Sequence, residues 1–190
     1  MLIVLAGPSG SGKTTLAATL RDEYRNALPL VSYATRRRRD SDRQGEMEFV
    51  TPPQFGRMAR SGEFLWTVKP FGKRNRYGTR KADVDRALGD EERVYLAILT
   101  IDTIPILHRY TMEHNTLSRL RCLYLHIDDT DELRRRLLRD RTRSDIDTRL
   151  AEANAENAAA QNMRDVLHFI DAKLPPDKVL ERARRIINII

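Results

Sequence analysis

One short segment near the start of the chain, residues 7–14, constrains its fold more than any other. It reads Gly-Pro-Ser-Gly-Ser-Gly-Lys-Thr and satisfies the pattern G-x-x-x-x-G-K-[S/T] completely. Glycines in this pattern permit a tight loop whose backbone N–H groups turn inward on phosphate oxygens. An apolar run, residues 2–6, precedes the loop and a helical pattern follows from Lys13, which is the strand–loop–helix context that the motif requires. We therefore predict a phosphate-binding loop (P-loop) rather than a chance glycine-rich turn.

The chemistry of this loop indicates a nucleoside triphosphate as its ligand. The ammonium of Lys13 supplies a point charge for the β- and γ-phosphates, and the hydroxyl of Thr14 is a ligand for Mg²⁺. The helix that follows adds the positive end of its dipole. We predict ATP and Mg²⁺ as cofactors, bound by Gly7, Ser9, Gly10, Ser11, Gly12, Lys13, Thr14 and Thr15.

Strand-like and helix-like segments alternate along the rest of the chain. Strands are expected at residues 2–6, 30–34, 94–101, 122–127 and 166–170, and helices at 13–24, 51–62, 79–88, after 103, from 129, at 145–163 and toward the end of the chain. Thr51 and Gln54 should form a capping box at the start of one helix. This alternation implies an α/β fold with a parallel sheet covered on both faces. Gly7, Thr35-Arg36 and Asp102 each follow an expected strand, so we expect them at one edge of the sheet, where such folds bind ligands.

The composition excludes several classes of protein. With 190 residues, 41% apolar and 32% charged, the chain suits a single globular domain. No apolar run is long enough to span a bilayer, and the first one lacks the basic start of a signal peptide. The single cysteine, Cys122, excludes a disulfide framework and a multi-thiolate metal site and is expected to be buried, and the four histidines lack metal-ligand spacing. We expect a cytoplasmic protein without a membrane partner.

The net charge of +7 fits either a nucleic-acid-binding protein or an enzyme that gathers arginines around phosphates. Four consecutive arginines, Arg36 to Arg39, follow the second expected strand. Arginines at that edge can hold a second phosphate in line with the γ-phosphate. Their position favours such a site over a solvated run, so nucleic acid is not the expected partner.

At these residues the sequence resembles the guanylate kinases. Their element S-x-T-T-R-x-x-R is matched by Ser32, Thr35, Arg36 and Arg39, and their Y-G-T element by residues 77–79. The resemblance implies a P-loop NTPase three-layer α/β sandwich with a mostly parallel sheet, a small acceptor-binding subdomain and an arginine lid. As one domain over 1–190, it would have its core at 1–31, 80–128 and 164–190, its acceptor-binding region at 32–79 and its lid at 129–163.

The resemblance also implies an activity and site residues. The activity would be ATP-dependent phosphoryl transfer to a small phosphorylated acceptor, GMP in this family, giving GDP and ADP. The phosphate of the acceptor would be held by Arg36, Arg39 and Tyr77, and its base recognised with the help of Ser32 and Thr79.

A second arginine cluster is similar to the lid of nucleoside monophosphate kinases. Arg134 and Arg135 should be solvated, because they share a helix with inward-facing leucines. Residues 141–143 leave that helix in a polar stretch, and Arg149 matches the arginine of the second lid helix in the family. Such arginines neutralise charge during transfer and exclude water. The catalytic residues implied are Lys13, Arg139, Arg141 and Arg149.

Asp102 ends the longest apolar strand candidate and admits two interpretations. Its carboxylate could bind Mg²⁺ through water, together with Thr14, or it could cap the helix that begins near Thr103.

Several positions depart from the family pattern. Trp66 stands where the family has a carboxylate that reads the guanine edge, and Ala97 and Leu99 replace aspartates of the central strand. The acidic residue after the arginines is matched by Asp42, and the family tyrosine falls near 48–49. A tryptophan in this region is also found in the ribose 1,5-bisphosphate phosphokinases. Alternative functions are therefore that kinase, another nucleotide kinase, or an inactive scaffold that binds protein or nucleic acid; a monomer and a homodimer are both compatible with the sequence.

Overall fold

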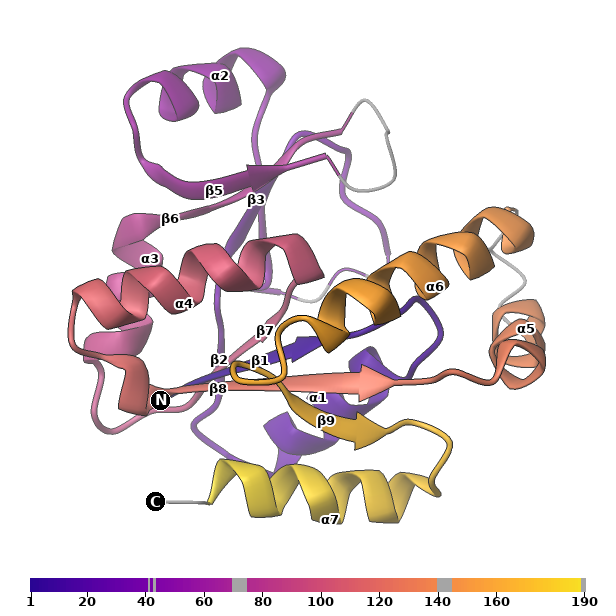
Figure 1. Cartoon of the computed structure of the whole chain (residues 1–190). Helices are drawn as coiled ribbons and strands as arrows, with labels where there is room; N and C mark the ends of the chain where they lie inside the picture. Colours follow the sequence, from indigo (N-terminus) through magenta and orange to yellow (C-terminus); the bar gives the residue numbers. More distant parts are fainter. Residues whose placement is uncertain (41, 43, 70–74, 140–144, 189–190) are drawn as a thin grey trace. The chain divides into compact units, whose positions relative to one another are not determined.

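The computed structural model describes residues 1–40, 42, 44–69, 75–139 and 145–188. The chain divides into two compact units, the first made of residues 1–2, 26–97 and 102–120 and the second of residues 3–25, 98–101 and 121–190. The strands form a five-stranded sheet in the order β2-β7-β1-β8-β9 and a four-stranded sheet in the order β4-β3-β6-β5 (Figure 1).

The five-stranded sheet carries the P-loop and confirms the predicted α/β class. Its strands are β1 (Leu2–Ala6), β2 (Leu28–Pro29), β7 (Tyr95–Ile98), β8 (Leu120–His126) and β9 (His168–Asp171). β2 runs parallel to β7 and β8 runs parallel to β9. All five residues of β1 are buried, as expected of a strand covered on both faces.

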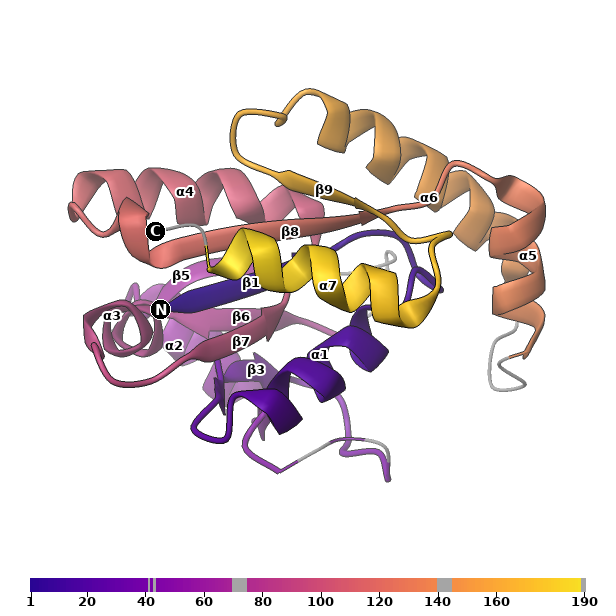
Figure 2. The same cartoon turned by 90° about the horizontal axis from the view of Figure 1, so that it is seen from below.

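In the second unit, helices cover both sides of these strands. The helices are α1 (Lys13–Glu23), α5 (Thr130–Arg139), α6 (Ile146–Gln161) and α7 (Pro176–Ile187). Figure 1 shows α1 and α7 on one side of β8 and β9 and α6 on the other, and Figure 2 shows α1 beside α7. The predicted stripe of α7 is buried at Val179, Ala183 and Ile187. Asp129 caps α5 as predicted, since its Oδ1 accepts a hydrogen bond of 2.9 Å from the backbone N of Glu132.

The first unit contains a four-stranded sheet that the sequence pattern did not predict. Its strands are β3 (Ser32–Ala34), β4 (Met47–Phe49), β5 (Phe64–Val68) and β6 (Tyr77–Arg80), and its helices are α2 (Pro52–Arg60), α3 (Lys81–Gly89) and α4 (Ile104–Glu113). β3 pairs parallel with β4 and antiparallel with β6, and β5 pairs antiparallel with β6. The predicted capping box is confirmed, with the Thr51 and Gln54 side chains each bonded to the other residue's backbone.

Aromatic rings form the core of this sheet. The rings of Phe55 and Phe64 stack at 4.6 Å, and Tyr33 meets Phe64 edge-on at 5.8 Å. Such pairs stabilise a small core beyond the apolar area that they bury. The cluster joins β3, β5 and α2, so it holds together the region that carries the candidate acceptor residues.

Several predicted elements have different bounds, and three of them lead into the candidate site. Of the expected strand 30–34 only residues 32–34 form a strand, β3, and the two residues of β2 that precede it belong to the other sheet. The helix expected from Thr79 begins at Lys81, because Tyr77, Thr79 and their neighbours pair with β5 as β6. The strand expected at 94–101 ends at Ile98 and is followed by a 3₁₀ turn, Ile101–Thr103. The ends of an element depend on strand pairing and turns, which the local sequence pattern does not fix.

Two further observations bear on the expectations from composition. Within the described residues, no helix is both long and apolar enough to cross a membrane. Cys122 is a free, buried thiol, and its burial raises the pKa to about 12, so it stays protonated and unreactive near neutral pH. The predicted partition into core, acceptor-binding region and lid stays a prediction.

Replacing Gly7 by alanine should destabilise the protein. Gly7 has φ +135°, and a Cβ placed there would lie 2.5 Å from the carbonyl oxygen of Leu125. We expect Gly7→Ala to lower the free energy of unfolding by roughly 2–4 kcal/mol, from backbone strain and steric overlap. Urea unfolding measures this.

The matched control is Gly89→Ala at the end of α3, where a Cβ would meet no atom within 4 Å. It should be neutral or stabilising by up to about 1 kcal/mol. Equal stability of the Gly7 variant and the wild type would contradict the prediction that a side chain at this position strains the turn.

Candidate active site

The P-loop turns sharply between β1 and α1. Gly7, Gly10 and Gly12 all have positive φ angles, +135°, +90° and +98°. These are backbone conformations that glycine adopts readily and most other residues do not. A Cβ at Gly10 would lie 3.1 Å from Leu133 of α5, so the loop also packs closely on that helix. The glycines predicted from the motif thus stand where the backbone requires them.

Lys13 is the first residue of α1, and its side chain folds back over the loop. Its Nζ donates hydrogen bonds to the carbonyl oxygens of Gly7, at 2.5 Å, and Pro8, at 2.8 Å. Thr14 and Thr15 are exposed on the first turn of α1. Ser11 is 3% exposed, and its hydroxyl has no hydrogen-bond partner in the described part of the chain. The loop therefore holds a cation, hydroxyls and a helix N-terminus, which together favour an anion.

One predicted lid arginine contacts the P-loop. Arg149, in the first turn of α6, donates from Nη1 to the hydroxyl of Ser9 at 3.1 Å. Arg139 is the last residue of α5 and is exposed. Arg141, and with it Arg143, lies outside the described residues. Arg134 and Arg135 are exposed as predicted, and Arg134 forms an ion pair of 2.8 Å with Asp147.

A buried polar pair, which the sequence did not reveal, fixes α6. The hydroxyl of Tyr124 donates to Oδ1 of Asn157 at 2.9 Å, and Nδ2 of Asn157 donates to the carbonyl oxygen of Ile127 at 2.8 Å. Tyr124 is completely buried. Because an unpaired hydroxyl there would be costly, this pair ties α6 to β8 and to the segment before α5. An asparagine in a polar helix carries no sequence signal for such a role.

The structure does not place Asp102 directly after a strand or at the cap of α4, as the sequence had suggested. Asp102 lies exposed in the 3₁₀ turn, four residues beyond the end of β7, and does not follow the strand directly. The N-cap residue of α4 is Thr103, so the helix-cap interpretation of Asp102 is wrong. Its carboxylate remains an available oxygen ligand.

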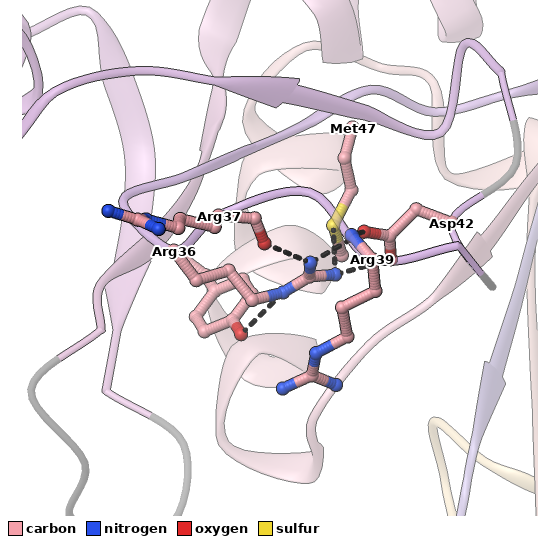
Figure 3. A network of polar contacts seen from close by, with 6 residues as sticks. Arg36, Arg37, Arg39, Asp42 and Met47 are labelled. Carbon is pink, nitrogen blue, oxygen red and sulfur yellow. Dashed lines mark hydrogen bonds and ion pairs between the residues drawn. The ribbon is translucent and has the colours of Figure 1, made fainter.

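The first unit brings the candidate acceptor residues together around Arg36 (Figure 3). Arg36 is only 9% exposed. Its Nε donates to the Tyr77 hydroxyl at 3.1 Å, and its Nη1 and Nη2 bind the carboxylate of Asp42 at 2.6 and 2.5 Å. The remaining donors reach the Arg37 carbonyl oxygen, at 2.9 Å, and the Met47 sulfur, at 3.1 Å.

The Arg36–Asp42 ion pair dominates the electrostatics of this network. Hydrogen bonds from Arg36 are the main reason that the pKa of Asp42 falls from 3.8 to about 2, and the backbone N–H of Arg39 adds to the effect. Asp42 also raises the pKa of Arg36. The guanidinium of Arg39 points away from the pair in Figure 3, and Arg39 is exposed. Of the predicted phosphate-binding groups, Arg39 is therefore the one open to solvent.

Arg36 also contacts Met47, which the sequence analysis did not identify, and Phe49, one of the two positions where the family tyrosine was expected. Both come from β4, and the ring of Phe49 lies 5.2 Å from the Arg36 guanidinium carbon. Phe49 thus meets the face of the guanidinium, and the Met47 sulfur accepts a hydrogen bond of 3.1 Å from its Nη2. A three-residue strand leaves too little periodicity to show which side chains face inward.

The residues expected at the base lie on β3 and β6. Ser32 is partly exposed, and Thr79 is 1% exposed with no hydrogen-bond partner for its hydroxyl among the described residues. Trp66 pairs with Thr79 across the strands and is 5% exposed. The position where the sequence lacks a carboxylate is therefore a buried indole next to an unbonded hydroxyl.

Asp83 stabilises β6 through its contact with Arg80 and is a further residue that the sequence analysis did not identify. This carboxylate is 4% exposed and accepts a hydrogen bond of 2.9 Å from Nε of Arg80, with Arg86 at 3.3 Å. The Arg80 guanidinium in turn lies 4.7 Å from the Tyr33 ring. These contacts fix the strand that carries Tyr77 and Thr79.

Acid should weaken the protein through Asp42. Because its pKa is lower in the folded protein, the Arg36–Asp42 pair stabilises the fold above about pH 4, and this contribution is lost as the pH falls toward 2. With screening by solvent, the contribution is roughly 1–2 kcal/mol. We expect urea unfolding of the wild type to lose this much more than Asp42→Asn between about pH 5 and about pH 2.5. Equal losses would show that the pair does not stabilise the fold.

Comparisons with known proteins agree with this arrangement. A family model described as guanylate kinase matches residues 1–175. The guanylate kinase of Anaeromyxobacter dehalogenans (strain 2CP-C) is 40% identical over 103 residues, which are 54% of this chain and 43% of that protein. The guanylate kinase of Wolbachia pipientis wMel is 29% identical over 191 residues, covering 99% of this chain and 89% of that protein.

The same fold is found among solved structures. The crystal structure of guanylate kinase from Anaplasma phagocytophilum matches 100% of this chain and 83% of its own, with a TM-score of 0.66 and 23% identity. The P-loop, the arginine-rich acceptor region and the family match all lie within the same stretch of sequence. This chain belongs to the guanylate kinase family.

Proposed function

We propose that this protein is an ATP-dependent guanylate kinase, which transfers the γ-phosphoryl group of ATP to GMP and releases GDP and ADP. The observation that carries the proposal is the family match over residues 1–175, which includes an intact P-loop. A cytoplasmic location and a monomer or homodimer belong to the same proposal.

The chemistry requires little beyond alignment and charge. The phosphate of GMP is an anion at neutral pH, so it can attack the γ-phosphorus without a strong base. The ammonium of Lys13 donates hydrogen bonds to carbonyl oxygens of the loop. With ATP bound, it would instead bind the β- and γ-phosphates. Arg149 is held at the loop by Ser9 and stabilises charge there. Fixed cations of this kind stabilise the transition state because they need no reorganisation during the reaction.

The residues fit a magnesium ion. The hydroxyl of Thr14 and the carboxylate of Asp102 are both exposed oxygen ligands, the type that Mg²⁺ prefers, and such ions usually retain several waters. Thr14 would hold the ion directly, and the water-mediated role expected of Asp102 stays a prediction. When bound, Mg²⁺ would neutralise negative charge on the phosphates of ATP.

The acceptor would be held by residues of the first unit. Arg39 and Tyr77, with Arg36, are assigned to the phosphate, and Ser32 and Thr79 to the base. The unbonded, buried hydroxyl of Thr79 supports this assignment, since a bound base could supply the missing hydrogen bond.

One observation favours a second candidate acceptor, ribose 1,5-bisphosphate. Guanine presents N–H groups that need oxygen acceptors, whereas this chain has buried Trp66, Ala97 and Leu99 at the positions where carboxylates were expected. A sugar bisphosphate needs no such acceptors. The phosphate-binding residues would serve either compound.

Lys13→Ala should abolish turnover without unfolding the protein. Loss of one fixed cation at the transferred phosphate should lower kcat by about 10²–10³-fold or more, as measured by coupled ADP release. The control is Lys178→Ala, an exposed lysine of α7 paired with Glu181, which should leave kcat unchanged. Retained turnover in the Lys13 variant would contradict the mechanism.

The acceptor can be identified by ADP release with GMP, dGMP, AMP, CMP, UMP and ribose 1,5-bisphosphate at equal concentrations. We expect GMP to give the highest kcat/KM. Activity with ribose 1,5-bisphosphate but not with GMP would replace the proposed acceptor and keep the phosphoryl-transfer chemistry. Absence of ADP release with every acceptor would support a scaffold without catalysis.

A further inference from the structure

Arg36 has no N–H group left for a ligand. A guanidinium carries five N–H donors, and here they reach Tyr77, Arg37, Met47 and, twice, Asp42. A side chain assigned to bind a phosphate is therefore fully occupied in the protein without its acceptor. This occupancy needs an explanation if Arg36 is to hold a substrate.

We propose that Asp42 competes with the phosphate of the acceptor for Arg36, so that this carboxylate sets the affinity for the acceptor. The inference rests on the proposed function, because it places the acceptor in the region 32–79. Its basis is the geometry of the ion pair. Asp42 meets Nη1 and Nη2 at 2.6 and 2.5 Å, the two-pronged arrangement that suits a carboxylate and a phosphate equally.

The guanidinium would keep its place if Asp42 left. Tyr77, the Arg37 carbonyl oxygen and Met47 still hold its other three donors, and the Phe49 ring lies 5.2 Å from its central carbon. Outside this pair, the hydrogen bonds of Asp42 among the described residues are local ones to the backbone of Arg39. A rotation of the Asp42 side chain would thus free two donors without dismantling the network.

When a phosphate replaces the Asp42 carboxylate, Arg36 keeps the same number of hydrogen bonds and the electrostatic energy of the neighbouring arginines improves. A phosphate oxygen pair would replace a carboxylate oxygen pair, so the number of charge-assisted hydrogen bonds stays the same. The neighbouring Arg37, Arg38 and Arg39 are exposed, and a doubly charged phosphate is attracted to them more than a singly charged carboxylate. Tyr77 accepts from Arg36, so its own hydroxyl proton can be donated to the arriving anion.

A purely structural role for Asp42 predicts the opposite effect. If the carboxylate only positions Arg36, its removal leaves a buried cation without a partner and disturbs the site, which weakens acceptor binding. If it competes, its removal strengthens acceptor binding. The sign of the change therefore separates the two roles.

The test compares Asp42→Asn with a matched control, Glu23→Gln. Glu23 binds both Nε and Nη2 of Arg184 in the second unit, so the control removes the same kind of pair elsewhere. Titration calorimetry with GMP at fixed ionic strength should give roughly tenfold tighter binding for Asp42→Asn and no change for Glu23→Gln. KM for GMP should fall in parallel while KM for ATP stays unchanged. Asp42→Ser is measured in the same way, so that the test can still be made if Asp42→Asn folds poorly.

Two further measurements tie the effect to Arg36 and to phosphate. Guanosine, which lacks the phosphate, should bind the wild type and Asp42→Asn equally. In an Arg36→Gln background, the Asp42 substitution should no longer strengthen GMP binding, because the shared partner is gone. A gain that persists without Arg36 would overturn the proposal.

The outcomes also separate this inference from the proposed function. Equal or weaker GMP binding by both Asp42 variants overturns the inference, and the function stands if the wild type phosphorylates GMP. Tighter GMP binding by Asp42→Asn in a protein that does not phosphorylate GMP supports the competition and rejects GMP as the substrate. Failure of all these proteins to bind GMP overturns both.

Discussion

A cation that is withdrawn from water must be met by oxygen atoms of the protein, and this constraint shapes every part of the candidate site. Arg36, almost buried, is met by Asp42 and three other groups. Lys13 is met by two loop carbonyl oxygens, and Arg149 by the Ser9 hydroxyl. Partners of this kind avoid the desolvation cost of an isolated charge. All of these partners except the Met47 sulfur are oxygen atoms of a carboxylate, a carbonyl or a hydroxyl, and a phosphate oxygen can take the place of each.

The partners differ in how strongly they compete. A carbonyl oxygen or a hydroxyl is neutral, so a phosphate displaces it with a clear gain in electrostatic energy. Asp42 is charged and bound at two points, and its lowered pKa shows that it remains an anion throughout the physiological range. The partners of Lys13 and Arg149 at the P-loop should therefore be displaced readily by ATP. In the acceptor region, Asp42 would compete with the ligand for Arg36. An enzyme that selects its acceptor more strictly than its donor would gain from this difference.

The P-loop could be predicted in detail because its backbone conformation restricts which residues its sequence can contain. Positive φ angles at Gly7, Gly10 and Gly12 permit few residues other than glycine, so the motif and the turn imply one another. Long buried elements such as β1 and β8 were predicted for a similar reason, since apolar runs between turn signals leave little choice. The cap of α2 followed from Thr51 and Gln54 by local hydrogen bonding alone.

The acceptor region could be predicted only in part, because its order comes from contacts between distant residues. The second sheet depends on pairing of strands as short as three residues, such as β3 with β4, which have no periodicity of their own. The arginine run indicated phosphate, but nothing in it distinguished Arg36, buried and fully bonded, from Arg39, exposed. That distinction arises from the partners of Arg36, among them Tyr77, which lies 41 residues away along the chain. Of four identical side chains in a row, tertiary structure turns one into a fixed anchor and leaves the others in solvent, and the anchor is the one whose ligand must displace a carboxylate.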